Sequence, residues 1–234
     1  ELTLVNAQGD PAQQQRQVEN AIAQGADLLL FTSADANLAA GSLRSAEEAN
    51  VPVVLYDHDA VGGRADAHVV FDSLSVGRAQ GKRAAELIEA MEKTPVRVAR
   101  IKGNQGEYGT GQYEKGQNEF LQPLIDSGKV EVVCEQYTQD WNPLVAQMFA
   151  EDCLTRTGGN VDVFLGMNDG TTGGAVAALI GQGYGPGEKL VTGGQDATVE
   201  ALRYIAQGWQ DNSILKDLRV EAAYAADVVV SILQ

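Results

Sequence analysis

The chain has 234 residues, of which 44% are hydrophobic and 21% charged, a composition typical of one or two folded domains with a buried core. Lysine and arginine number 17 against 32 aspartates and glutamates, which gives a formal net charge of −15. Such a charge offers no broad cationic surface, so nucleic acid and anionic membrane surfaces are excluded as expected partners. The sequence shows neither an apolar run of the roughly 18 residues that a membrane span needs nor a signal peptide, which leaves a cytosolic chain or a removed signal.

Apolar runs alternate along the chain with amphipathic helical patterns, which is typical of parallel strands connected by crossover helices. The stretches LLLF, VPVVLY and VDVFLGM are apolar almost throughout, so their strands are expected to be covered on both faces. The pattern therefore predicts an α/β fold. Strands are expected over residues 2–6, 26–32, 53–57, 68–72, 96–102, 130–136, 161–167, 189–193 and 213–216.

Local signals mark the ends of several helices. Asp10 precedes Pro11, and Asn142 precedes Pro143. Each pair combines a capping side chain with a proline at the first helical position, which predicts a helix start directly after a strand. Glycines predict helix ends at positions 25, 128 and 183.

Nearly every predicted strand ends next to a hydrogen-bonding side chain. Ligands of open α/β sheets bind at the carboxyl ends of the strands, where such side chains converge. Each aspartate or asparagine alone can instead be a helix cap, and Trp141 can instead be a core residue. Together they indicate a site for a ligand rich in hydroxyl groups, with Trp141 as a flat apolar wall. The residues are Asn6, Ser33, Asp57, His58, Asp72, Asn104, Asp140, Trp141, Asn168, Asp169, Gln195, Asp196 and Lys216.

Signatures of common enzymes are missing from the sequence, which contains neither GxSxG nor GxGxxG. The stretch GRAQGK at residues 77–82 has the wrong spacing for a phosphate loop and fits an amphipathic helix running from Ser75. DHDAVG from Asp57 resembles a calcium loop, but Val61 stands where an oxygen ligand is needed. Asp57 with Asp196 leaves a glycosidase as an alternative. Binding without covalent chemistry, cofactor or metal is the more economical interpretation.

Two cysteines, Cys134 and Cys153, lack the spacing of a metal site. Burial as free thiols and a disulfide are both left open. A disulfide would place the protein in an oxidising compartment.

A family resemblance is carried by the segments NAQGD, QVENAIAQGADLLLF, VPVVLYDHD, FDSLSVGRAQG, NDGTTGGAVAALIGQG and GGQDATVEALRYIAQG. In this order they resemble the periplasmic sugar-binding proteins of bacterial ABC importers, which are type I periplasmic binding proteins, and most of all the members that bind xylose. The resemblance covers essentially the whole chain. It implies two doubly wound parallel-sheet lobes, joined by a hinge, that close on a monosaccharide.

The resemblance also implies ligand-binding roles. Asp57 and His58 stand where the family has an Asp-Arg pair that holds the sugar from the first lobe. Trp141 matches the tryptophan that stacks on the sugar ring. Asn168 and Asp196 match the pair of the second lobe that binds hydroxyl groups. A further match, Lys216, corresponds to a lysine donor near the hinge.

Some positions depart from the family pattern. His58 replaces the arginine, which removes a fixed bidentate donor and leaves the sugar undecided. Glu107 is a further ligand candidate, although residues 107–109 read Glu-Tyr-Gly where the xylose binders have Asp-Asn-Asn. Asp169 is expected to cap the helix that follows Asn168 rather than to bind sugar.

The expected N-terminal lobe comprises residues 1–98 plus 214–234, and the expected C-terminal lobe comprises residues 99–213. The chain starts at what should be the family's second strand and stops short of its closing segment. The N-terminal lobe is therefore expected to lack its first strand, and the chain to be a fragment, because such a lobe would expose strand edges.

The expected function is that of the substrate-binding component of an ABC importer. It would bind a monosaccharide, a xylose-like pentose or a related hexose, and deliver it to the membrane permease. The protein is expected to be a monomer in the periplasm or outside the cell, as a lipoprotein or a secreted protein. A sugar-sensing domain of a transcriptional repressor or a membrane receptor kinase, with the same fold, is the alternative.

Overall fold

The computed structural model describes residues 2–234, which form two compact units. Unit 1 comprises residues 1–71, 106–109 and 217–234, and unit 2 comprises residues 72–105 and 110–216. The predicted α/β class with parallel strands is confirmed, since every strand pair in both units is parallel. None of the helices described between residues 2 and 234 combines the length and the apolar character that a membrane span requires.

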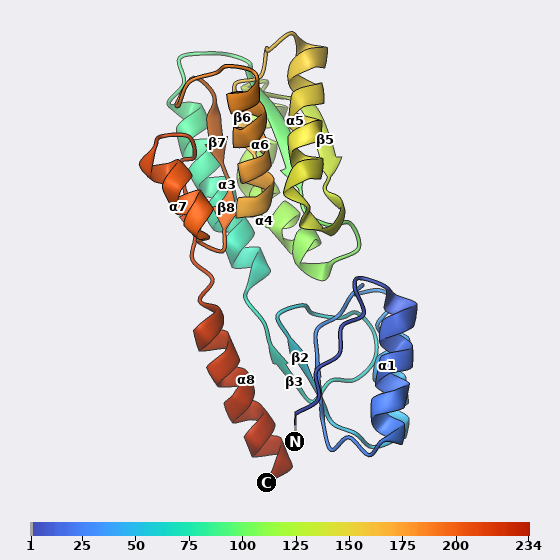
Figure 1. Ribbon diagram of the computed structural model, residues 1–234. Helices are drawn as coiled ribbons and strands as arrows, with labels where there is room; N and C mark the ends of the chain where they lie inside the picture. Colours follow the sequence, from blue (N-terminus) through green and yellow to red (C-terminus); the bar gives the residue numbers. More distant parts are fainter. Residues whose placement is uncertain (1) are drawn as a thin grey trace. The chain divides into compact units, whose positions relative to one another are not determined.

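Unit 1 is built on a three-stranded sheet of order β1-β2-β3. Val53 and Leu55 of β2 pack with α1 and α2, whereas Val54 alternates to the opposite face. The sixth element, α8, packs against β2 and β3 (Figure 1). The elements are α1 (Pro11–Ala23), β1 (Leu29–Phe31), α2 (Ala40–Glu48), β2 (Val53–Tyr56), β3 (Ala67–Val69) and α8 (Leu218–Leu233).

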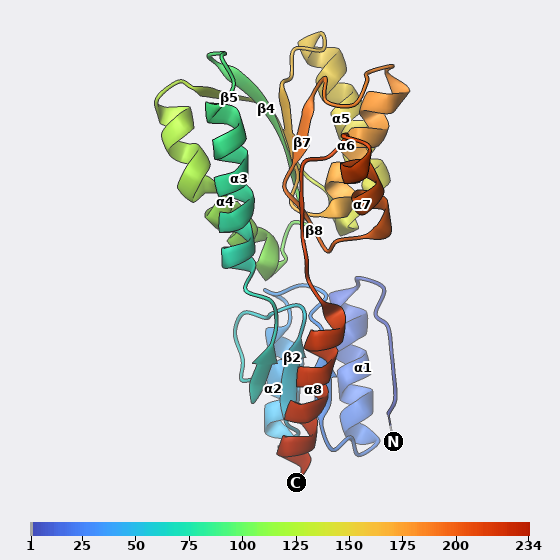
Figure 2. The same ribbon diagram turned by 90° about the vertical axis from the view of Figure 1, so that its left-hand side faces the viewer.

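Unit 2 contains a four-stranded sheet of order β5-β4-β6-β7 and a separate parallel pair, β8-β9. Helices α3 and α4 cover one face of the larger sheet, and α5 and α6 cover the other (Figure 2). Each face of the sheet has its own buried apolar cluster. The strands are β4 (Val96–Lys102), β5 (Val130–Tyr137), β6 (Val163–Leu165), β7 (Leu190–Thr192), β8 (Gly194–Gln195) and β9 (Ser213–Ile214). The helices are α3 (Ser73–Glu89), α4 (Tyr108–Asp126), η1 (Gln139–Trp141), α5 (Pro143–Thr157), α6 (Asp169–Gly181) and α7 (Val199–Ala206).

Glycines let α3 and α4 approach each other closely. A Cβ atom on Gly81 would lie 2.6 Å from Cα of Gln117, and one on Gly116 would lie 2.6 Å from the carbonyl carbon of Gly77. Backbone therefore packs on backbone at this crossing, which no larger residue permits. The helix predicted from Ser75 is α3, so GRAQGK is helical as expected.

The units divide at residues 71/72 and 216/217, whereas the predicted division lay at 98/99 and 213/214. The difference at the first crossing is mainly α3. Its glycine-mediated packing on α4 and its apolar contacts with β4 place it in unit 2.

The strand predicted over residues 2–6 is wrong. These residues are not assigned to a strand, and the side chains of Leu2 and Leu4 are 89% and 92% exposed. An apolar run becomes a strand only where a neighbour completes its ladder, and none of the described strands pairs with this segment.

Cys134 of β5 and Cys153 of α5 form a disulfide in the core on the α5 side of unit 2. The bond links a strand to the helix that covers it. This settles the alternative that the sequence left open, because no free cysteine is found.

Candidate functional site

The candidate site residues fall into two groups, one in each unit. Trp141, Asn168, Asp196 and Lys216 belong to unit 2, and Asp57, His58 and Glu107 belong to unit 1. All of them follow the carboxyl end of a strand or lie in the loop after it.

Trp141 is held by close contacts in unit 2. A Cβ atom on Gly103, the residue after β4, would collide with the indole ring, so the ring lies against bare backbone. Tyr113 of α4 meets the ring edge-on at a centroid distance of 6.2 Å and an interplanar angle of 74°. The indole is half-buried and locked in place, as a stacking wall for a ligand needs to be.

The backbone before Trp141 is also special. Asp140 and Trp141 both have φ of 53°, in the left-handed region that non-glycine residues rarely adopt. The amide of Asp140 donates to Oδ1 of Asn104 at 3.0 Å, which helps to hold this turn. Such conformations persist where the surroundings over-determine them, and they are frequent at ligand sites.

Asn168 is the N-cap of α6, and Asp169 is not. Oδ1 of Asn168 accepts from the amide of Thr171 at 2.8 Å, and Oγ1 of Thr171 accepts from the amide of Asn168 at 3.1 Å. The prediction that Asp169 caps this helix is therefore wrong. Because Oδ1 faces the helix, the Nδ2 amide group of the half-buried Asn168 is turned to the other side, where it can donate to a hydroxyl oxygen.

Asp169 instead holds the loop that carries Asp196. Its carboxylate is 5% exposed and accepts from the amide of Thr198 at 2.7 Å and from Oγ of Ser213 at 2.7 Å. Oγ of Ser213 in turn accepts from the amide of Ala197 at 3.0 Å. The loop that follows β8 is thus fixed to α6 and β9 by charge-assisted hydrogen bonds.

Asp196 sits in this loop with φ of 95°, and Ala197 follows with φ of 52°. The amide of Asp196 donates to the carbonyl of Ile214 at 2.8 Å. Nζ of Lys216 lies 3.9 Å from Oδ1 of Asp196, and the carboxylate side chain is 37% exposed. A carboxylate and an ammonium group side by side offer a hydroxyl both an acceptor and a donor.

In unit 1, Asp57 and His58 follow β2 as predicted. Asp57 has φ of 58° and its amide donates to the carbonyl of Val69 at 3.0 Å. The His58 ring places Nδ1 3.3 Å from the carbonyl oxygen of Ser33 and Nε2 3.5 Å from Oδ2 of Asp57. Both ring nitrogens therefore face acceptor oxygens, and the imidazole is oriented between its two neighbours.

The adjacent Tyr56, at the end of β2, has a shifted pKa. Burial raises the pKa of its phenol above the ordinary value, and the carboxylates of Glu221 and Asp57 add to the effect. Carboxylates therefore surround the carboxyl end of β2 and disfavour further negative charge there.

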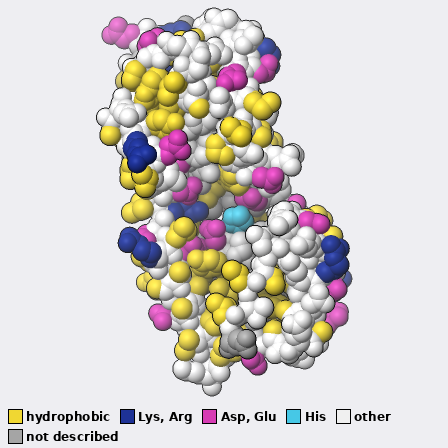
Figure 3. All heavy atoms as spheres, viewed as in Figure 1, with side chains coloured by type: hydrophobic (Ala, Val, Ile, Leu, Met, Phe, Trp, Pro, Cys, Tyr) yellow, Lys and Arg dark blue, Asp and Glu magenta, His cyan; other side chains and the backbone are white. Residues whose placement is uncertain are grey.

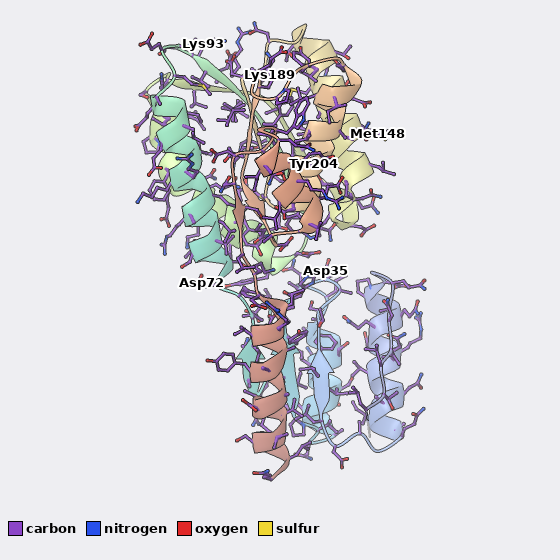
Figure 4. The ribbon with its side chains drawn as sticks, turned by 60° about the vertical axis from the view of Figure 1, so that its left-hand side comes forward. Asp35, Asp72, Lys93, Met148, Lys189 and Tyr204 are labelled. Atoms are coloured by element: carbon purple, nitrogen blue, oxygen red, sulfur yellow. A yellow bond between two sulfur atoms is a disulfide. The ribbon has the colours of Figure 1, made fainter. Side chains whose placement is uncertain are left out.

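Glu107 directly precedes α4. It belongs to the short segment 106–109 of unit 1, where a Cβ atom on Gly106 would lie 2.9 Å from Oδ2 of Asp35. Asp35, which is labelled in Figure 4, lies in the loop after β1 and accepts from the amide of Asn37 at 2.8 Å. The structure thus associates this candidate with the β1 loop.

The surface of both units carries many acidic side chains, as the excess of aspartate and glutamate in the composition predicts (Figure 3). Aspartate and glutamate side chains are spread over both units on the face shown in Figure 3. Figure 4 shows Lys93 and Lys189 of unit 2 beyond the amino-terminal ends of β4 and β7, and Asp72 at the opposite end, where α3 begins. Among residues 2–234 no group of histidine, cysteine, aspartate or glutamate side chains has the geometry of a metal site.

Parallel-sheet units with polar side chains at the carboxyl ends of their strands are typical of a class of proteins that bind small ligands there. The model of the periplasmic binding protein domain matches residues 1–234, so the chain belongs to that family. Its relatives include the D-xylose-binding periplasmic protein of Haemophilus influenzae, 30% identical over 227 residues that make up 97% of this chain and 66% of that protein. The multiple sugar-binding periplasmic receptor of Rhizobium radiobacter is 29% identical over 96% of this chain and 67% of its own.

Solved structures show the same fold. An ABC transporter solute-binding protein from Clostridium phytofermentans, with bound β-D-glucose, superposes with a TM-score of 0.90 at 27% identity. The match covers 99% of this chain and 74% of that one. The chain spans about two thirds of the length of the curated relatives named above. The predicted type I periplasmic binding protein fold is confirmed.

Proposed function

We propose that this chain is the ligand-binding part of a bacterial ABC sugar importer and that it binds a monosaccharide without altering it. In unit 2 the sugar stacks on Trp141 and exchanges hydrogen bonds with Asn168, Asp196 and Lys216. In unit 1 it bonds with Asp57 and His58. A ligand that engages both groups stabilises the arrangement in which both are bound, and the permease then takes up the sugar from that arrangement.

The observation that carries the proposal is the composition of the unit 2 strand ends. A closely packed indole, an amide donor, a carboxylate and an ammonium group lie in loops at the carboxyl ends of parallel strands. Sugars present an apolar ring face and a belt of hydroxyl groups that both donate and accept. The named relatives, which bind xylose or several sugars, and the neighbour holding glucose support the same ligand class.

The buried disulfide supports a place in the periplasm or outside the cell. Disulfides persist in oxidising compartments, and this one links a core strand to a core helix. The chain is proposed to act as a monomer. No observation on the described residues favours the sugar-sensor alternative.

Isothermal titration calorimetry against D-xylose, D-glucose, D-galactose, D-ribose and L-arabinose tests the proposal. One of these sugars is expected to bind, Asp196→Ala to weaken binding at least tenfold, and the sugar to be recovered unchanged after prolonged incubation. Asp152→Asn, on the exposed side of α5, is the control and should bind as the parent does. Heat from none of the sugars would refute the ligand class, and a changed sugar would refute binding without chemistry.

A further inference from the structure

Two glutamine side chains are buried in unit 2 on the side of the sheet away from α5 and α6. Gln80 of α3 is 0% exposed and Gln117 of α4 is 1% exposed. Burying a carboxamide is costly unless its groups are hydrogen-bonded, so a buried pair needs an explanation. Both lie next to the glycines at which α3 and α4 cross closely.

The pair uses every amide hydrogen that it has. Nε2 of Gln80 donates to the carbonyl of Met167 at 2.9 Å and to that of Gly193 at 2.7 Å. Nε2 of Gln117 donates to Oε1 of Gln80 at 3.0 Å and to the carbonyl of Gly166 at 2.9 Å. A guanidinium nitrogen of Arg100 donates to Oε1 of Gln117 at 3.3 Å, so the carboxamide oxygens of both glutamines also accept a hydrogen bond.

The three carbonyls that accept from the glutamines lie just beyond the ends of two strands. The last residue pair of the β6–β7 ladder is Leu165 and Thr192. The amide of Gly166 still donates to the carbonyl of Thr192 at 3.0 Å. Beyond that point the strands no longer provide donors for each other's carbonyls. The side-chain amides of the two glutamines supply the missing donors for these three carbonyls.

The residues that follow these carbonyls are the candidate ligand residues. Asn168 comes directly after Met167, and Asp196 follows Gly193 through the two residues of β8. One nitrogen atom, Nε2 of Gln80, therefore ties together the two segments that carry Asn168 and Asp196. The tie comes from the sheet face opposite to α6, which is the helix that Asn168 caps.

We infer that Gln80 and Gln117 are positioning residues for sugar binding, which fix the spacing of Asn168 and Asp196 through the backbone carbonyls of residues 166, 167 and 193. The inference rests on the proposed function. Neither glutamine touches the ligand. Their role is to keep two ligand-bearing loops at a fixed separation before the sugar arrives.

Gln80→Met is the variant that separates positioning from filling space, because methionine keeps the length of the side chain and removes both donors. Ile88→Val on the same helix is the control, since it weakens the apolar core of α3 without touching the carbonyls. The first readout needs no ligand. In Gln80→Met, amide hydrogen exchange should accelerate at least tenfold in residues 166–168 and 193–196 and stay unchanged in the β4–β5 ladder.

The second readout is the affinity for whichever of D-xylose, D-glucose, D-galactose, D-ribose or L-arabinose binds the parent. Gln80→Met should weaken binding about tenfold, the loss expected for one misplaced hydrogen bond, and Ile88→Val should leave it unchanged. In an Asp196→Ala background the effect of Gln80→Met should shrink to less than threefold, because the residue being positioned is gone.

Equal exchange rates in the two segments of Gln80→Met and the parent would overturn the inference. So would an undiminished effect of Gln80→Met on affinity in the Asp196→Ala background. If no sugar binds the parent, the proposed function fails instead, and local acceleration in the two segments alone still supports the bracing of the strand ends.

Discussion

Asp169→Asn is expected to destabilise unit 2 strongly while leaving its fold intact. The buried carboxylate accepts from the Thr198 amide and the Ser213 hydroxyl, both at 2.7 Å. Asparagine keeps one acceptor and turns an NH₂ group toward the other donor. The Ser213 hydroxyl can rotate to accept instead, but the Thr198 amide cannot, so the retained oxygen is expected to face Thr198.

The cost follows from these contacts. Hydrogen bonds to a charged group contribute about 1.5–3 kcal/mol each, and the substitution weakens two of them. We expect the free energy of unfolding of unit 2 to fall by about 2–4 kcal/mol. The loop of Asp196 is held by the same carboxylate, so sugar affinity should fall as well.

Urea denaturation followed by tryptophan fluorescence measures this cost in the correct unit. Both tryptophans of the chain, Trp141 and Trp209, lie in unit 2, so the signal reports on unit 2 alone. Asp152→Asn, which removes an exposed ion pair with Arg156, is the control and should change the midpoint little. An Asp169→Asn midpoint equal to that of the control would show that the buried hydrogen bonds do not hold the loop.

Three further predictions concern the stability of unit 2. Replacing Cys134 and Cys153 together by alanine opens a link between residues 19 apart, and the free energy of unfolding should fall by about 3 kcal/mol; an unchanged urea midpoint would contradict this. Gly81→Ala should destabilise the packing of α3 on α4 by about 1–3 kcal/mol. Gly111→Ala is the control: its Cβ atom would have no neighbour within 4 Å, so it should stabilise α4 by about 0.5–1 kcal/mol. A thermal unfolding experiment in which Gly81→Ala is the more stable of the two variants would refute the close approach of the helices. Burial raises the pKa of Asp162, but hydrogen bonds from the Lys93 side chain and the Arg97 amide outweigh this effect and lower the pKa below its ordinary value of 3.8. The contribution of Asp162 to the stability of unit 2 is therefore present above about pH 4 and is lost as the pH falls through the pKa of the folded state. Asp162→Asn should therefore cost about 1–2 kcal/mol at pH 7 and progressively less as the pH falls below 4. A cost independent of pH in urea titrations would rule out the ion pair as its source.

The regular elements of the chain could be predicted because they depend on local signals. The strand over residues 96–102 and the helices that begin at Pro11 and Pro143 are found where the sequence places them. The glycines at positions 25, 128 and 183 follow helices with positive φ, as expected of helix ends. The strand predicted over residues 213–216 is found as β9, whereas β8 lies outside the predicted strands because a two-residue strand carries no detectable periodicity.

The site was harder to predict, because its supporting contacts come from distant parts of the chain. Asn168 and Asp169 are both good capping residues, and the sequence alone does not decide between them. The choice is made by Thr198 and Ser213, which lie 29 and 44 residues further on and hold Asp169. The contacts of Gln80 and Gln117 with carbonyls are likewise invisible, since a glutamine in a helix usually indicates an exposed face.

The stacking of a monosaccharide on Trp141 is tested most directly by NMR of the tryptophan indole groups in a ¹⁵N-labelled chain. During titration with D-xylose, D-glucose, D-galactose, D-ribose and L-arabinose in turn, the indole Nε1–H signal of Trp141 should shift with one of the sugars, while that of Trp209 stays in place. Trp209 packs with the apolar cluster of α5 and α6 and serves as the internal control. A sugar that moves only the Trp209 signal, or a panel that moves neither, would contradict the account.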